Sequence, residues 1–398
     1  MKHAINTRNI LMYMMTGAIV LFSFFPDYLN YTVLVKYDIF INLTIVSLII
    51  FYLMYYQKIH KYYLLVSMFL IIQLFSTILH HGQIASAIWG KGILLLYMCV
   101  GIQFTYNYNE NIFLKNIYCF FYLLIIINFI SLLLFPDGMY EDIRGIKNTN
   151  FFLGNYNGFI IYIYPTIAIG YIFFKKYSNK IPLNYIILWF ISLGTIIIKG
   201  SITSLFGLCF LVLYMILFNN KVFRYIFNIK TYLIFNISFF YFLVWNNSNS
   251  WLLKKMVNLL GKDITFTGRT KIWQNAKVHI MNHLLLGNGL ESAEVLSEKL
   301  NLYDKMSFVA HTHNLVIDVL YKSGLGGFIV FSMLFLLLLQ KVKRLNDTKI
   351  RYFLEAFLGI FLLMSQFEAY NIKPIFIILT ILYFYTSNNQ ITRTGKIT

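Results

Sequence analysis

The chain has 398 residues, of which 59% are hydrophobic, 19% aromatic and only 12% charged, and its mean hydropathy is +0.67. An ordinary soluble domain is about 45–50% apolar and about 25% charged, so this composition excludes a soluble globular protein. The formal net charge is +18, but the basic residues are spread between apolar runs. That distribution indicates loops between membrane spans and argues against nucleic acid as a partner.

Apolar runs long enough to cross a bilayer recur along the whole chain, which predicts an all-α integral membrane protein. We place about 12 transmembrane helices at 9–25, 38–56, 63–80, 84–104, 113–135, 156–174, 183–199, 201–219, 231–246, 314–340, 352–368 and 372–387. The shortest division is Lys199–Gly200–Ser201, and it is kept because one merged helix would be far longer than a bilayer is thick. The three cysteines, Cys99, Cys119 and Cys209, lie in these runs without paired spacing and predict neither disulfides nor a metal site.

Basic residues predict the orientation of these spans. If the N-terminus is inside, 18 of the 33 Lys and Arg residues fall in inner segments, whereas the short outer loops hold only Lys36, Arg144, Lys147, Lys199 and Lys373. The positive-inside rule therefore predicts both termini on the cytoplasmic side.

Three parts of the chain follow from this topology. Residues 1–246 hold the first nine helices, residues 247–312 form a large extracytoplasmic loop, and residues 313–398 hold the last three helices. Long ordered loops on a rigid scaffold usually carry function, so the loop is the expected location of a site. No GxxxxGK[ST] sequence occurs, which argues against ATP-driven transport by this chain alone.

Within the loop, FTGRTKIWQNAKVHIMNHLLLGNGLES predicts an amphipathic helix, capped by Asp263 or Thr267 and ended by Gly287 and Gly289. Its apolar face would consist of Ile272, Trp273, Ala276, Ile280 and Leu284. Arg269 stands at the start of this helix. It fits either an arginine solvated at the interface or a clamp on phosphate, because guanidinium and free helix amides both favour oxyanions.

The loop ends in FVAHTHNLVIDVLYKSGLGG, with His311 and His313 in front of a membrane helix. These histidines fit either a wet interface or a general base, and zinc is disfavoured because no cysteine, aspartate or third histidine is nearby. Asp318 and Lys322 are spaced for an i,i+4 pair inside the helix. Gly324, Gly326 and Gly327 would allow another helix to pack closely.

Three stretches together resemble the O-antigen ligase/polymerase superfamily. TGRTKIWQNAKVHIMNHLLLGNGL looks like its GR…W…A…G.G segment, HTHNLVIDVLYKSGLGGF like its HN…L…G..G segment, and FFLGNYNGFIIYIYP like its GN.N segment. One departure occurs in KGSITS, where Ile202 stands at the position of an arginine found in many members. Lys199 or Arg144 would then have to supply the missing charge.

The resemblance implies a membrane glycosyltransferase of the C-type architecture, inverting and metal-independent, with no cofactor, on the outer face of a bacterial cytoplasmic membrane. Its donor would be an undecaprenyl-diphosphate-linked oligosaccharide. His313 and Arg269 would be catalytic, with His313 preferred over His311 as base because it directly precedes Asn314, as in the family pattern. Arg269, Lys199 and Arg144 would bind the diphosphate. The residues that would orient the substrate are Asn314, His311, Asn155, Asn157 and Trp273.

Three functions stay open at this point. We favour a polymerase of O-antigen or capsule repeat units, with a chain-length regulator and a flippase as partners to be tested. A ligase that transfers the glycan to lipid A core or to a protein shares the same motifs. A flippase for lipid-linked oligosaccharides is the third alternative, although the large outer loop and the lack of evident inverted repeats argue against it.

Overall fold

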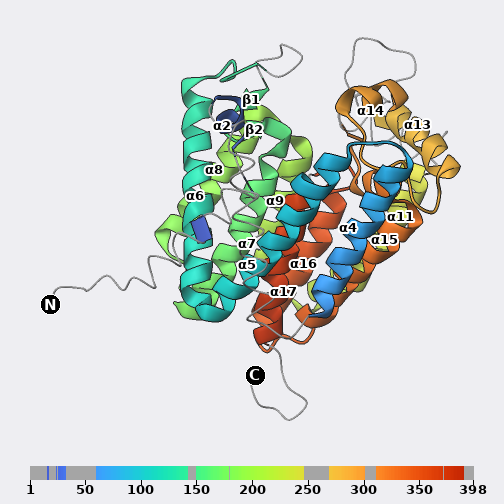
Figure 1. Cartoon of the computed structure of the whole chain (residues 1–398). Helices are drawn as coiled ribbons and strands as arrows, with labels where there is room; N and C mark the ends of the chain where they lie inside the picture. Colours follow the sequence, from blue (N-terminus) through green and yellow to red (C-terminus); the bar gives the residue numbers. More distant parts are fainter. Residues whose placement is uncertain are drawn as a thin grey trace.

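A computed structural model describes residues 16–17, 24, 26–32, 60–141, 149–178, 180–245, 269–300, 311–370 and 372–389. Helices make up 79% of this part, and a short antiparallel pair, β1 (Asn150–Phe151) and β2 (Gly154–Asn155), lies near one end of the bundle (Figure 1). The predicted spans 9–25 and 38–56 fall almost entirely outside the described residues. So do Asp263 and Thr267, the expected caps, and Arg144.

Within the described residues, four helical segments are long and apolar enough to cross a membrane: α4 (Lys61–Leu79), α6 (Glu110–Leu134), Tyr156–Tyr177 and α15 (Leu315–Val342). The third of these joins the 3-10 turn η2 (Tyr156–Gly158) to α7 (Ile160–Tyr177). The other elements are α2 (Asp27–Thr32), η1 (Ser86–Ile93), α5 (Leu94–Tyr108), α8 (Leu183–Lys199), α9 (Ile202–Leu217), α10 (Lys221–Ile226), α11 (Ile229–Phe239), η3 (Phe240–Trp245), α13 (Arg269–Asn282), α14 (Ala293–Leu300), α16 (Thr348–Met364) and α17 (Ile372–Asn388). The total of 12 spans stays a prediction.

Each predicted span from 63–80 onward coincides with a described helix or helix pair to within several residues. The division at Gly200 is confirmed, because this residue adopts a left-handed conformation and donates its N–H to the carbonyls of Ile196 and Ile197. The end predicted for the span 352–368 is wrong, since α16 stops at Met364. Ser365 to Phe367 then form a hydrogen-bonded turn, and Glu368 to Tyr370 have no regular structure.

Hydroxyl groups link the helices inside the bundle. Tyr62 on α4 shares a 2.8 Å hydrogen bond with Thr380 on α17, and Tyr164 on α7 donates to the Phe357 carbonyl on α16 at 3.0 Å. Lipid tails give apolar helices no hydrophobic reason to associate, so close packing and interhelical hydrogen bonds of this kind hold such bundles together.

The turn that follows α13 contacts both α4 and α15 through its backbone. Leu325 and Gly326 donate their N–H groups to the carbonyls of Leu284 and Leu285, at 2.8 and 3.0 Å. This insertion breaks α15 at Gly324, which has φ 58° and ψ −163°. A Cβ atom on Gly324 would lie 2.4 Å from the Leu285 carbonyl.

Two glycines of the turn after α13, Gly287 and Gly289, allow its backbone to approach α15 and α4. Cβ atoms on Gly287 and Gly289, which both have a φ of 75°, would lie 2.6 Å from the Gly324 nitrogen and 2.5 Å from the Thr77 Cα on α4. Their expected role as the end of the loop helix is wrong, because α13 already stops at Asn282. The partner that approaches Gly324 is this turn, whereas a Cβ on Gly327 would contact Phe69 of α4 at 3.6 Å.

We predict that Gly324→Ala destabilises the protein far more than Gly200→Ala. Both positions have positive φ, so alanine costs each about 1–2 kcal/mol of backbone strain. Only Gly324 also meets backbone atoms that have no room to move, whereas nothing lies within 4 Å of a Cβ on Gly200. Thermal unfolding of the purified variants in detergent measures the difference, and equal losses would contradict the role given to the turn.

Candidate functional site

Helix α13 presents Arg269 from its first residue and packs its apolar face against α15 and η3. Ile272, Trp273, Ala276 and Ile280 are buried as their spacing predicted, but Leu284 lies beyond the helix end and is 37% exposed. The apolar face fixes the rotation of the helix, and rotation decides where Arg269 points. Arg269 is therefore positioned by the core cluster beneath it.

The segment from His311 to Asn314 is held by hydrogen bonds on both sides. The indole Nε1 of Trp273 donates to the Thr312 carbonyl at 2.9 Å, and the Thr312 hydroxyl donates to the Asn314 carbonyl at 3.0 Å. Within this frame His313 has φ 53°, and its N–H donates to Nδ1 of His311 at 3.3 Å. A non-glycine residue with positive φ persists where its surroundings fix it, and such residues concentrate at functional sites.

Asn314 joins the start of α15 to the loop after α16. Its side-chain oxygen accepts from the Ile317 N–H at 3.0 Å and caps α15, while its amide nitrogen donates to the backbone and side-chain oxygens of Gln366, at 2.9 and 3.2 Å. Asn314 is fully buried and Trp273 is only 3% exposed. Both residues therefore support the loop through buried hydrogen bonds, and their expected role in orienting the substrate stays a prediction.

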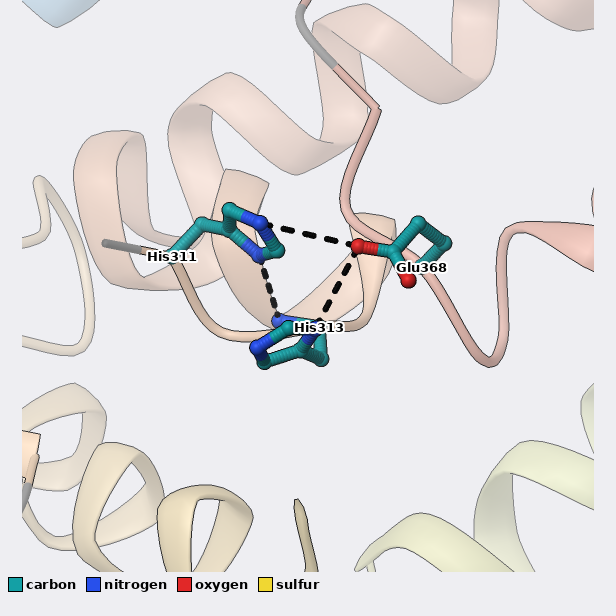
Figure 2. Close-up of side chains that lie close together, drawn as sticks. All are labelled: His311, His313 and Glu368. Atoms are coloured by element: carbon teal, nitrogen blue, oxygen red, sulfur yellow. Dashed lines mark hydrogen bonds and ion pairs between the residues drawn. The ribbon is translucent and has the colours of Figure 1, made fainter. Parts of the chain in front are cut away.

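The tether to Gln366 brings in Glu368, a carboxylate that the sequence analysis did not select. Figure 2 shows both imidazoles turned toward the same oxygen of Glu368. Oε1 of Glu368 lies 3.3 Å from Nδ1 of His313 and 3.5 Å from Nε2 of His311. The first distance is slightly longer than that of an ideal N–H···O hydrogen bond.

Burial and neighbouring charges set the protonation of this cluster. Burial raises the pKa of Glu368. The interaction with His313 and the charges of His313, His311 and Arg269 lower this pKa by a larger amount, so that it lies below the ordinary value. Burial, followed by the charge of His313, lowers the pKa of His311 to about 4. At neutral pH Glu368 is thus ionised and His311 is neutral.

Arg269 lies against the other oxygen of Glu368. One guanidinium nitrogen donates to the Phe367 carbonyl, and the other forms an ion pair with Oε2 of Glu368 at 3.2 Å. The Arg269 side chain keeps 17% of its surface exposed. A guanidinium has five N–H donors, so two contacts leave donors free for an anionic ligand.

The cluster also has the ligand types of a metal site. His311, His313 and Glu368 each offer one atom, and these atoms lie within 4.8 Å of one another. Two histidines and one glutamate are a known ligand set for zinc with an open fourth position. The sequence argument against zinc assumed no third ligand nearby, and Glu368 removes that assumption.

Other predicted site residues lie elsewhere. Lys199 at the end of α8 donates to the Pro136 carbonyl at 2.9 Å, with its ammonium 4.1 Å from the centre of the Phe151 ring. The side chain of Asn155 in β2 accepts from the N–H of Asn157 at 3.0 Å. Figure 1 places β1 and β2 next to α6 and α8, away from α13. Among the described residues, no contact joins Lys199, Asn155 or Asn157 to the histidine cluster.

Glu368 had a sequence signal that went unused. It is an acidic residue at the edge of an apolar run, and ionisable residues in such runs deserve a functional hypothesis by default. The predicted span 352–368 made Glu368 the last residue of a membrane helix, whereas α16 ends at Met364 and Glu368 lies in the loop after it. The predicted pair of Asp318 and Lys322 is confirmed, with 2.6 Å between carboxylate and ammonium.

Residues 187–332 match the family model described as O-antigen ligase. The match contains the three positions Arg269, His311 and His313, and it ends before Glu368. It confirms the resemblance to the O-antigen ligase/polymerase superfamily, and together with the apolar helices it identifies a membrane protein. A comparison with curated proteins gave no match.

We predict that Asn314→Ala lowers stability more than Asn109→Ala. Asn109 caps α6 in the same way, accepting from Ile112 N–H at 3.0 Å, so its loss removes a cap worth about 1 kcal/mol. Asn314→Ala removes a cap and also leaves buried acceptors on Gln366 unpaired, which adds about 1–3 kcal/mol. Unfolding midpoints of the two variants in detergent test this order, and a matching loss would mean that the tether contributes nothing.

Proposed function

We propose that this chain, whose residues 187–332 match the O-antigen ligase family model, transfers a glycan from a polyprenyl diphosphate carrier to a sugar hydroxyl at the cluster of His313, Glu368 and Arg269. Members of the family are glycosyltransferase-like enzymes. The observation that carries the proposal is Glu368, whose two oxygens face an imidazole on one side and a guanidinium on the other.

In this proposal His313 is the general base. Its Nδ1 lies 3.3 Å from Oε1 of Glu368. With the Nδ1 proton directed at this carboxylate, the opposite nitrogen, Nε2, would take the proton of the acceptor hydroxyl. That oxygen then forms a bond to the anomeric carbon, while the bond from this carbon to the diphosphate oxygen breaks and its electrons leave with the diphosphate. A single displacement of this kind inverts the anomeric centre.

Arg269 would stabilise the charge that develops on the departing diphosphate. Preorganised donors placed at such a charge need no reorganisation during the reaction, and removing one typically costs about 10²–10³ in rate. The salt bridge to Glu368 holds the guanidinium at the start of α13, where the helix dipole also favours an anion. Lys199 and Arg144 stay proposals for the remaining charge, from outside this cluster.

A second repeat unit on its own carrier is the acceptor that we favour, which makes the enzyme a polymerase of O-antigen or capsule. A ligase is the second candidate, because the matching family model carries that description. The two differ only in the acceptor. The same cluster would serve either, on the outer face of the cytoplasmic membrane.

We expect purified protein to convert a lipid-linked repeat unit into a ladder of longer glycans, resolved by gel or mass spectrometry. His313→Ala and Glu368→Gln should each lower the rate by about 10²–10⁴, the usual contribution of a positioned base. Arg269→Lys keeps the charge but loses the planar fork, so its rate should fall between wild type and Arg269→Ala.

Matched controls separate chemistry from general damage. His283→Gln changes a histidine on the same side of the protein, and Lys271→Ala removes an exposed cation from α13 itself. Both should retain wild-type rates. Glycan transfer to a lipid A core acceptor without a ladder would identify a ligase, and unchanged donor with both acceptors would sink the enzyme proposal and favour a transporter.

We further expect transfer to be insensitive to metal removal. A metal at this cluster would need the carboxylate of Glu368, and this carboxylate already has Arg269 as its cation. An excess of chelator should therefore leave the rate unchanged. Loss of activity in chelator, restored by zinc but not by magnesium, would instead assign His311, His313 and Glu368 as metal ligands.

A further inference from the structure

A basic pocket of about 690 Å³ lies at the opposite end of the bundle from the histidine cluster. It is formed by the start of α4, the end of α15 and the end of α17, and its lining includes His60, Lys61, Gln340, Lys341, Arg344 and Tyr383. Helix α4 runs from this pocket to the turn after α13, where Ser76 donates to the Gly287 carbonyl at 3.1 Å. The pocket is therefore a separate site that the proposed glycosyl transfer does not use.

The lining has a strong excess of positive charge. It contains Lys61, Lys341 and Arg344 but no carboxylate, and within the described ranges none of these cations is paired with an acidic side chain. Lys341 instead lies 4.7 Å from the centre of the Tyr383 ring. Burial, and then the charge of Lys341, lower the pKa of His60 below its ordinary value. Three unpaired cations around one cavity favour an anion.

Apolar surface continues from this pocket along both helices. On α15, Met333, Leu337 and Gln340 follow at four- and three-residue steps, so they share one face of the helix, and Arg344 lies in the turn directly after it. On α4, Lys61, Leu64 and Met68 likewise share one face. Leu64, Met68 and Met333 are 58%, 52% and 49% exposed. A phosphate in the pocket would thus be connected to surface that suits acyl chains.

We propose that this pocket binds the headgroup phosphate of an anionic membrane phospholipid, with its acyl chains along the exposed faces of α4 and α15. Both helices are long and apolar enough to cross a membrane, so the pocket lies where a helix end meets the headgroup layer. Basic pockets between membrane helices are known to bind anionic headgroups, and each nearby Lys or Arg strengthens such attraction about fivefold. The volume is within the usual range for small-ligand sites.

The test is a titration of purified full-length protein in detergent with phosphatidylglycerol, phosphatidylcholine or inorganic phosphate, followed by the shift in unfolding temperature. Wild type should bind phosphatidylglycerol about 100-fold more tightly than phosphatidylcholine, from three cations at about fivefold each. The triple variant Lys61→Gln, Lys341→Gln and Arg344→Gln should lose this preference. Arg344→Gln alone, at an exposed position, should lose about fivefold.

The matched control is the double variant Lys343→Gln with Lys349→Gln, which removes exposed cations just after α15 and in the first turn of α16, outside the pocket lining. This variant should keep the wild-type preference. Equal preference in wild type and the triple variant, or an equal loss in the control, would overturn the proposal. Stabilisation by inorganic phosphate as strong as that by phosphatidylglycerol would also overturn it, since the site would then recognise a soluble anion.

Discussion

The backbone contact between the turn after α13 and the break in α15 is the constraint on which the candidate site depends. Leu325 and Gly326 donate to carbonyls of that turn, and Gly324 provides the conformation and the space that the contact needs. This contact fixes α13 against α15, and Arg269 and the histidines belong to these two parts of the chain. A side-chain contact would allow more movement than four backbone groups in direct hydrogen bonds.

A single carboxylate organises the chemistry above this contact. Glu368 meets His313 through one oxygen and Arg269 through the other, so a base and a cation are held at a fixed separation. The loop that carries Glu368 is itself tied to Asn314, the cap of α15. The cap, the tether and the proposed catalytic residues are therefore parts of one connected unit, in which the buried Asn314 and Gln366 support partly exposed side chains.

The two ends of the bundle have different electrostatic character. Around Glu368, cation and carboxylate are balanced, which suits a site where charge develops during a reaction. Around Lys341, cations gather without an acidic partner among the described residues, which suits steady binding of an anion. Helices α4 and α15 extend between both ends, so the same pair of helices carries the proposed reactive site at one end and the proposed lipid site at the other.

The sequence by itself determined the helical membrane fold, most span positions, the buried face of α13 and the nomination of Arg269 and His313, because periodicity and local motifs encode these features. Tertiary structure alone decided that Glu368 joins them, since it approaches from a distant loop whose position depends on how α16 ends. It also decided that Asn314 and Trp273 are buried supports and that Lys199 lies elsewhere. Spacing along a chain reports neighbours within one helix, whereas contacts between helices depend on packing that no local pattern contains.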